Sequence, residues 1–181
     1  MRHWLVSALL LTLLLTSCSP QQGNRVHTYA IGDRVQVGPL VYNVFGTRWL
    51  THLGVGSESR IPKQRFFLVR LSVVNSGPQA TPVPLFQLVD DQGGTHDEIS
   101  NGTGVPEWLG YLRDIQPAAT MQGNVIFDVP PAHYKLRVTE ESESHVAMVE
   151  MPLQFQMDTP GLTESLPIQQ QELPLRSPTS R

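Results

Sequence analysis

Apolar residues alternate with a period of two along several short stretches of this chain, and this pattern restricts the fold more than any other feature. Between residues 65 and 75, one face carries only apolar side chains: Phe67, Val69, Leu71 and Val73. Successive side chains of a β-strand point to opposite faces, so period two predicts half-buried strands. About seven such stretches, separated by glycine, proline and Asx turns and with no convincing long helix between them, predict an all-β antiparallel sandwich of about seven strands.

The charge of the chain argues against one large class of function. Thirteen basic residues stand against sixteen acidic ones, which gives a formal net charge of −3. A general nucleic-acid-binding protein needs a strongly basic surface. We therefore expect no nucleic-acid partner.

The first seventeen residues follow the order of an export signal. Met1–His3 is basic, and ten of the twelve residues from Trp4 to Leu15 are apolar. As a helix these twelve residues would be about 18 Å long, against roughly 30 Å of hydrocarbon in a bilayer. Residues 1–17 are therefore predicted to be a removable signal peptide rather than a transmembrane anchor.

The sequence Leu15-Thr16-Ser17-Cys18 resembles the lipobox of bacterial lipoproteins, in which small residues precede a cysteine that is lipidated on sulfur. Cys18 is the only cysteine of the chain, so it has no partner for an internal disulfide. The resemblance implies a diacylglycerol on Cys18 that holds the protein to a membrane of the cell envelope. We expect the outer membrane in a two-membrane organism, and otherwise the outer face of the plasma membrane.

The mature chain divides into three predicted parts. Residues 18–30 are polar and carry Pro20 and Gly23, which predicts the lipidated cysteine followed by a flexible tether. Residues 31–157 contain the alternating stretches and are predicted to form the sandwich. Residues 158–181 carry four prolines and a glutamine run but no aromatic residue. Such a segment buries too little apolar surface to order itself, so we expect a disordered tail.

Several stretches, read in order, carry a resemblance to a known family: Ile31–Asp33, Leu40–Val44, Phe67–Gly77, Phe86–Gly93, Ile115–Pro117 and Gly123–Pro130. In their order and spacing, residues 31–152 resemble the telokin-like, immunoglobulin-like domain of unknown function that recurs on many bacterial lipoproteins. The resemblance implies an exported, immunoglobulin-like sandwich without catalytic activity. Two positions depart from the family pattern. Ala118 stands where the family usually has glycine after a proline, and His96 stands where an aromatic residue commonly follows the hairpin.

One candidate binding feature is the connection Ile99–Asp114, which is longer than a sandwich needs. It carries Trp108 and Tyr111, and exposed aromatic residues are typical anchors of recognition sites. The alternative is that Trp108 and Leu112 plug one end of the sandwich. Residues 106–112 could also form a helical turn or two behind a proline.

A second candidate feature is basic. Residues 25–70 contain seven basic and two acidic residues, and we single out Arg60 and Lys63 as binding residues. Together with Arg48 and Arg65 they are predicted to form a basic loop region. Such a region could face lipid head groups, a cell-wall polymer or an acidic partner.

These features predict an exported, lipid-anchored cell-envelope protein. Its non-catalytic domain would act as a binding or accessory module for an envelope protein or cell-wall polymer. The alternative is an envelope metal-binding protein or hydrolase that uses the acidic hairpin Asp90–Glu98. That hairpin lacks the regular spacing of a calcium loop, and the mature histidines do not form the paired motifs of zinc enzymes. We assign no catalytic residue, metal ligand or cofactor.

Overall fold

Eleven β-strands form in residues 26–54, 56 and 59–153, the part of the chain that the computed structural model describes. They are β1 (His27–Tyr29), β2 (Arg34–Val37), β3 (Leu40–Leu50), β4 (Phe66–Asn75), β5 (Thr81–Pro82), β6 (Gln87–Asp90), β7 (Thr95–Asp97), β8 (Asp114–Ile115), β9 (Thr120–Asp128), β10 (Tyr134–Thr139) and β11 (Val146–Met151). Within these residues no helix has the length and apolar character needed to cross a membrane. The predicted signal peptide, Cys18 and the predicted tail lie outside the described residues.

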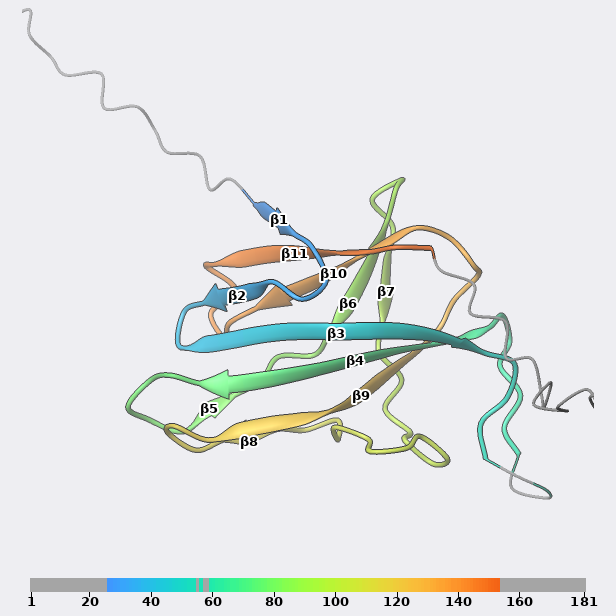
Figure 1. Cartoon of the computed structure of the whole chain (residues 1–181), viewed down its shortest axis with the longest axis horizontal. Helices are drawn as coiled ribbons and strands as arrows, with labels where there is room; N and C mark the ends of the chain where they lie inside the picture. The colour runs from blue at the N-terminus through green and yellow to red at the C-terminus, as the bar shows by residue number, and fades with distance from the viewer. Residues whose placement is uncertain (1–25, 55, 57–58, 154–181) are drawn as a thin grey trace, which may run out of the picture.

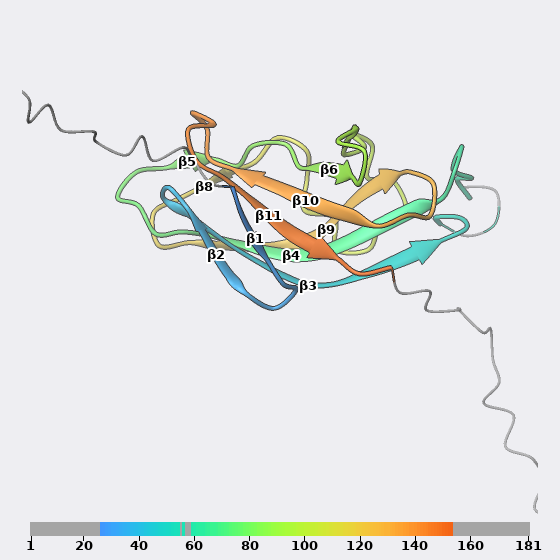
Figure 2. The ribbon, with the colours of Figure 1, turned by 90° about the horizontal axis from the view of Figure 1, so that it is seen from above.

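The strands form two main sheets that face each other (Figures 1 and 2). One sheet has the order β1-β11-β10-β6-β7, the other has the order β2-β3-β4-β9, and β5 pairs with β8. This architecture confirms the predicted immunoglobulin-like β-sandwich. More strands form than predicted, because several are only two to four residues long and too short to show a period.

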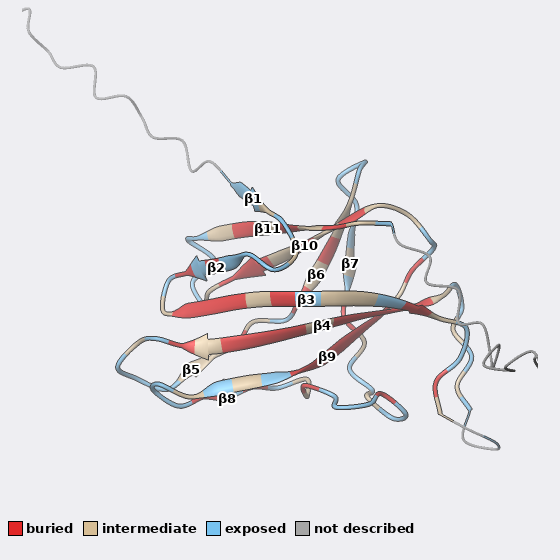
Figure 3. Cartoon of the chain, in the orientation of Figure 1, coloured by how far each residue is buried: buried red, intermediate tan, exposed pale blue. Residues whose placement is uncertain are grey.

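The inward face of β4 is the centre of the core. Its alternating residues Phe67, Val69, Leu71 and Val73 are all buried between the sheets, as their period predicted. Burial of each such side chain stabilises the fold by roughly 1.5–3 kcal/mol. Figure 3 shows that β4 is buried along almost its whole length.

The outward face of β4 is more buried than the sequence predicted. Phe66 and Leu68 are only 2% and 5% exposed, although the period of two predicted a strand with one buried and one partly exposed face. They belong to a second, smaller apolar cluster: Leu53, Phe66, Leu68, Val105 and Ile126. This cluster exists because residues 98–113, here called the β7–β8 connection, fold over the outside of the sheet.

The β7–β8 connection contains no helical turns at residues 106–112, so that prediction was wrong. Glu107 and Gly110 both have positive φ angles, which a right-handed helix does not allow. The backbone pairs with the edge of β9 instead. Asn124 donates its N–H to Glu107 O at 2.8 Å, and Leu109 donates its N–H to Asn124 O at 3.0 Å.

Strand β1 fixes where the chain enters the domain. It pairs in parallel with the beginning of β11, so His27 lies opposite Ala147. These residues belong to the segment predicted as tether, but their main-chain hydrogen bonds place them in the sheet. We call this the near end of the sandwich, which also carries the β10–β11 turn. The far end carries the β3–β4 connection, residues 51–65, and lies about 35 Å away along the eleven-residue strand β3 (Figure 1).

A tight turn at the near end explains one departure from the family pattern. Ala119 donates its N–H to Gln116 O at 3.1 Å, with Pro117 and Ala118 between them. Ala118 has a φ of 59°. This is the left-handed conformation that the third position of a type II turn requires and that glycine adopts without strain.

We predict that Ala118→Gly stabilises the domain by about 0.5–1 kcal/mol, because it relieves the left-handed alanine. Chemical denaturation of both proteins measures the difference. The neighbouring substitution Ala119→Gly is the control and should destabilise, since Ala119 packs against the core and does not have a positive φ. A loss of stability in Ala118→Gly would contradict the strain argument.

Candidate functional site

The predicted basic residues lie at the far end, but Arg60 has a structural task there. Its Nη1 donates to the carbonyl oxygens of Asn101 and Thr103, both at 2.8 Å, and its guanidinium lies over the Phe66 ring. Arg60 therefore ties the β3–β4 connection to the β7–β8 connection. Lys63 lines a hollow beside it, next to Ile61, which is 83% exposed.

The predicted aromatic residues point to different surfaces. Trp108 is 37% exposed, and its indole packs against Gly102, where an added Cβ would lie only 1.9 Å from the ring. Tyr111 lines a hollow on the outer face of the other sheet, beside Gln87 and Arg137. The four predicted binding residues therefore do not form one site.

The alternative in which Trp108 and Leu112 plug the sandwich is wrong for Leu112, which is 90% exposed. Leu109 is buried in the main core instead. The apolar spacing of the segment did not distinguish these residues, because the segment meets β9 at one isolated bridge, Trp108 with Asn124, and is neither a regular strand nor a helix.

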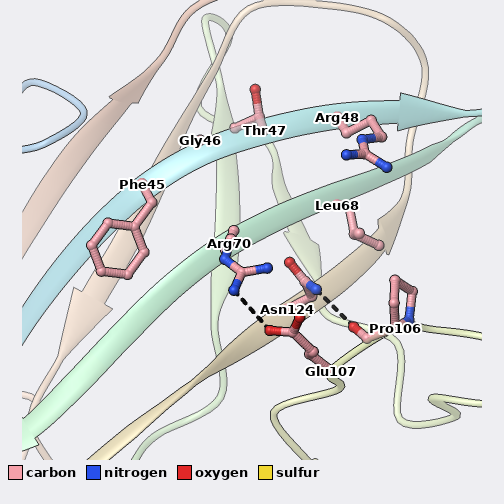
Figure 4. Close-up of a pocket in the computed structure, with 9 residues that line it drawn as sticks. All are labelled: Phe45, Gly46, Thr47, Arg48, Leu68, Arg70, Pro106, Glu107 and Asn124. Atoms are coloured by element: carbon pink, nitrogen blue, oxygen red, sulfur yellow. Dashed lines mark hydrogen bonds and ion pairs between the residues drawn. The ribbon is translucent and has the colours of Figure 1, made fainter. Parts of the chain in front are cut away.

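A groove of about 370 Å³ lies on the outer face of the four-stranded sheet (Figure 4). We call it the sheet groove. Its lining comes from β3, β4, β9 and the β7–β8 connection: Phe45, Gly46, Thr47, Arg48, Leu68, Arg70, Pro106, Glu107 and Asn124. Arg48 thus belongs to a strand and not to the predicted basic loop region.

A β-bulge shapes the sheet groove. Val44 lies opposite Leu71 and Gly46 lies opposite Arg70, so Phe45 is an extra residue in β3. Its side chain is 48% exposed. Gly46 adds no side chain, and a Cβ there would meet nothing within 4 Å. The bulge therefore turns the Phe45 ring outward, next to a part of the groove surface that no side chain covers.

Two arginines give the sheet groove its charge. Arg70 Nη2 lies 2.7 Å from Glu107 Oε2, and Arg48 makes no hydrogen bond or ion pair within the described part of the chain. On the opposite wall, Asn124 Nδ2 donates to Pro106 O at 2.7 Å and holds the connection in place. Sequence reasoning did not select Phe45, Arg70 or Glu107. The break in alternation at Phe45-Gly46 was a signal that could have found Phe45, but no local pattern points to Arg70 or Glu107.

The carboxylates of the acidic hairpin are engaged within the fold. Asp90 Oδ1 accepts the N–H groups of Gln92 and Gly94, and the Gly94 hydrogen bond is the main cause that lowers the pKa of Asp90. Asp97 accepts from Gln87 Nε2 at 2.8 Å. Residues 26–54, 56 and 59–153 contain no group of three or more histidine, cysteine or acidic side chains able to hold a metal ion.

Glu98, at the end of the same hairpin, belongs to a buried ion pair. Its Oε2 contacts Arg113 Nη2, and both side chains are buried. Its Oε1 accepts the N–H of Phe86 at 2.9 Å, and Arg113 Nε donates to Gly110 O at 2.6 Å. Burial raises the pKa of Glu98, and Arg113 acts against that rise.

The profile of the family described as "Domain of unknown function (DUF4352)" matches residues 29–146, more than half of the chain. The chain belongs to this family. No curated protein matches the sequence of this chain significantly.

Several solved structures share the fold of this DUF4352 domain. The yjhA protein from Bacillus subtilis has a TM-score of 0.55 and 14% identity, over 68% of this chain and 99% of its own. The secreted protein MPT63 from Mycobacterium tuberculosis has a TM-score of 0.52 and 16% identity, over 71% and 99%. The "putative lipoprotein (ycdA)" from Bacillus subtilis subsp. subtilis str. 168 has a TM-score of 0.51 and 16% identity, over 66% and 38%. At these identities the similarity shows the fold alone.

A histidine links the β6–β7 turn to β11 at the far end of this DUF4352 domain. His133 Nδ1 lies 2.9 Å from Asp91 Oδ1 and its Nε2 lies 2.7 Å from Glu150 Oε1. Both ring nitrogens face acceptors, so the charged imidazolium fits best, since it donates from both. The hydrogen bond to Asp91 is the main cause that raises the pKa of His133, and the charges of Asp91 and Glu150 add to it.

We predict that His133 stabilises the domain most below pH 6.5, the usual pKa of an unfolded histidine, and that this contribution is lost as the pH rises through the raised folded value. Denaturant unfolding from pH 5.5 to 8.5 should show this loss in the wild type and not in His133→Gln. By NMR, the ring should titrate above 6.5, and Asp91→Asn should lower its pKa. A ring that titrates at or below 6.5 would contradict the prediction.

Proposed function

We propose that this DUF4352 protein is exported, anchored through lipid on Cys18, and acts in the cell envelope as a non-catalytic binding or accessory module. The export signal and the lipobox-like sequence before Cys18 support the anchor. The descriptions of two structural neighbours, a secreted protein and a "putative lipoprotein", support a location outside the cytoplasm. The anchor would lie on the outer membrane of a two-membrane organism, or on the outer face of the plasma membrane otherwise.

The parallel pairing of β1 with β11 carries this proposal. It places the first described residues at the near end, only eight residues after Cys18. A lipid at Cys18 would therefore hold the near end toward the membrane. The far end would face away from the lipid, at about 35 Å along β3.

The far end has the surface chemistry of a contact site. Ile61 is exposed beside Lys63 in the far-end hollow, and Arg60 holds this region against the β7–β8 connection that carries Trp108. We propose that Lys63 and Trp108 contact an envelope protein or cell-wall polymer, with Arg60 holding the surface in shape. Tyr111 would contribute only to a partner that also reaches the outer face of the other sheet.

We expect Cys18→Ser to abolish all incorporation of labelled palmitate, because Cys18 is the only cysteine. Mass spectrometry of the wild-type N-terminal peptide should find the thioether-linked diacylglycerol. Ser19→Ala, one residue further on, is the control and should keep the lipid. A wild-type protein with an unmodified sulfur that diffuses freely would overturn the proposed anchor.

We expect Trp108→Ala to leave the domain folded and to weaken capture of partners by the anchored protein in mild detergent. Trp108 is part-exposed, and its backbone pairing with β9 does not need the indole. Leu112→Ala, which also truncates an apolar side chain at an exposed position of the same connection, is the control. A large loss of thermal stability in Trp108→Ala together with unchanged capture would show that Trp108 is structural.

A further inference from the structure

We infer that the sheet groove binds an acidic polypeptide segment in an extended conformation, with one carboxylate taking the place of Glu107 on Arg70 and a second on Arg48. This inference rests on the proposed role as a binding module and specifies the chemistry of its partner. The partner class follows from three features: the spacing of the arginines, the weakly held internal carboxylate and the apolar surface beside them.

The strand register sets the spacing of the two arginines. Arg48 lies opposite Leu68, and Gly46 lies opposite Arg70. Arg48 and Arg70 are therefore diagonal neighbours on one face, roughly 7–8 Å apart at the backbone. Alternate side chains of an extended polypeptide repeat at about 7 Å. Two carboxylates at alternate positions of such a segment can reach both guanidinium groups at once.

Glu107 shows which group the sheet groove accepts. Its carboxylate sits on Arg70 at 2.7 Å, with the two side chains 43% and 61% exposed. An exposed pair of this kind is weak and easily exchanged for an equivalent one. A carboxylate from a partner can therefore replace it.

The apolar lining favours a polypeptide over a polyphosphate. The outward Phe45 ring and the exposed Pro106 border the charged groups (Figure 4). An apolar side chain next to a carboxylate would bury surface against them. A phosphate polymer would leave these groups uncovered and would use the arginines alone.

The test uses a fluorescein-labelled decapeptide with two glutamates at alternate positions next to a leucine. The control peptide has glutamine in place of both glutamates. Binding to the full chain, purified in detergent, is measured by fluorescence polarisation. We expect the acidic peptide to bind at least about fivefold tighter than the glutamine control peptide. Arg48→Gln and Arg70→Gln should each reduce that affinity, and Glu107→Gln should raise it about two- to fivefold by freeing Arg70.

Glu143→Gln is the matched control. Glu143 pairs with Arg137 at 2.8 Å, is equally exposed at 61%, and also has a positive φ. It lies at the β10–β11 turn, beside the hollow on the outer face of the other sheet. Its substitution therefore removes one negative charge but leaves Arg70 paired with Glu107. It should leave peptide binding unchanged. Thermal melting of each variant checks that the domain is folded.

Three results would overturn the inference: equal binding of the two peptides, no effect of the arginine substitutions, or the same gain for Glu143→Gln as for Glu107→Gln. Polyphosphate that binds with the predicted pattern while the peptide does not would also overturn it. Failure of peptide binding in a chain that is acylated at Cys18 would leave the proposed function standing. An unacylated, freely diffusing chain would overturn the proposed function whatever the peptide does.

Discussion

The buried pair Glu98–Arg113 joins the two ends of the β7–β8 connection, the outer layer of the domain. Two charges removed from water are costly, and loss of one partner from such a pair costs about 3–5 kcal/mol. Here the remaining donors and acceptors are largely occupied: Phe86 supplies an N–H and an aromatic face, and Gly110 supplies a carbonyl. Arg113 also accepts the N–H of Val83 through its backbone carbonyl. The pair therefore fixes both ends of the β7–β8 connection against the sandwich.

The sheet groove depends on that connection. Pro106 and Glu107 form one wall of the groove, and they stay against β9 because the connection is pinned at Glu98 before them and at Arg113 after them. Arg60 adds a third attachment at Asn101 and Thr103. A long surface segment without these attachments would leave Phe66 and Leu68 in water. The outer layer thus converts an ordinary sheet face into a small core with a groove beside it.

The inner half of the fold could be predicted from sequence, and the outer half could not. Phe67, Val69, Leu71 and Val73 alternate because one face of β4 meets the opposite sheet, and this local pattern is visible in the chain. Phe66 and Leu68 are covered by residues about forty positions away, which no local period reports. The candidate site has the same difficulty. Arg70 and Glu107 are brought together only by the path of the connection. Nor does any local pattern predict that Arg60, a candidate binding residue, also donates to the carbonyl oxygens of Asn101 and Thr103.

Both departures from the family pattern have a local physical reason, and they differ in kind. Ala118 keeps the type II turn at the cost of a left-handed alanine. His96 keeps the packing instead, since its ring meets Tyr134 edge-on at 5.6 Å, as an aromatic residue would, and also lies 3.2 Å from Asp90. The histidine therefore preserves the hairpin while adding a polar contact at its base. The backbone shape of the sandwich tolerates both changes because neighbouring strands fix it, and this leaves the outer surfaces as the part in which members of one fold can differ in what they bind.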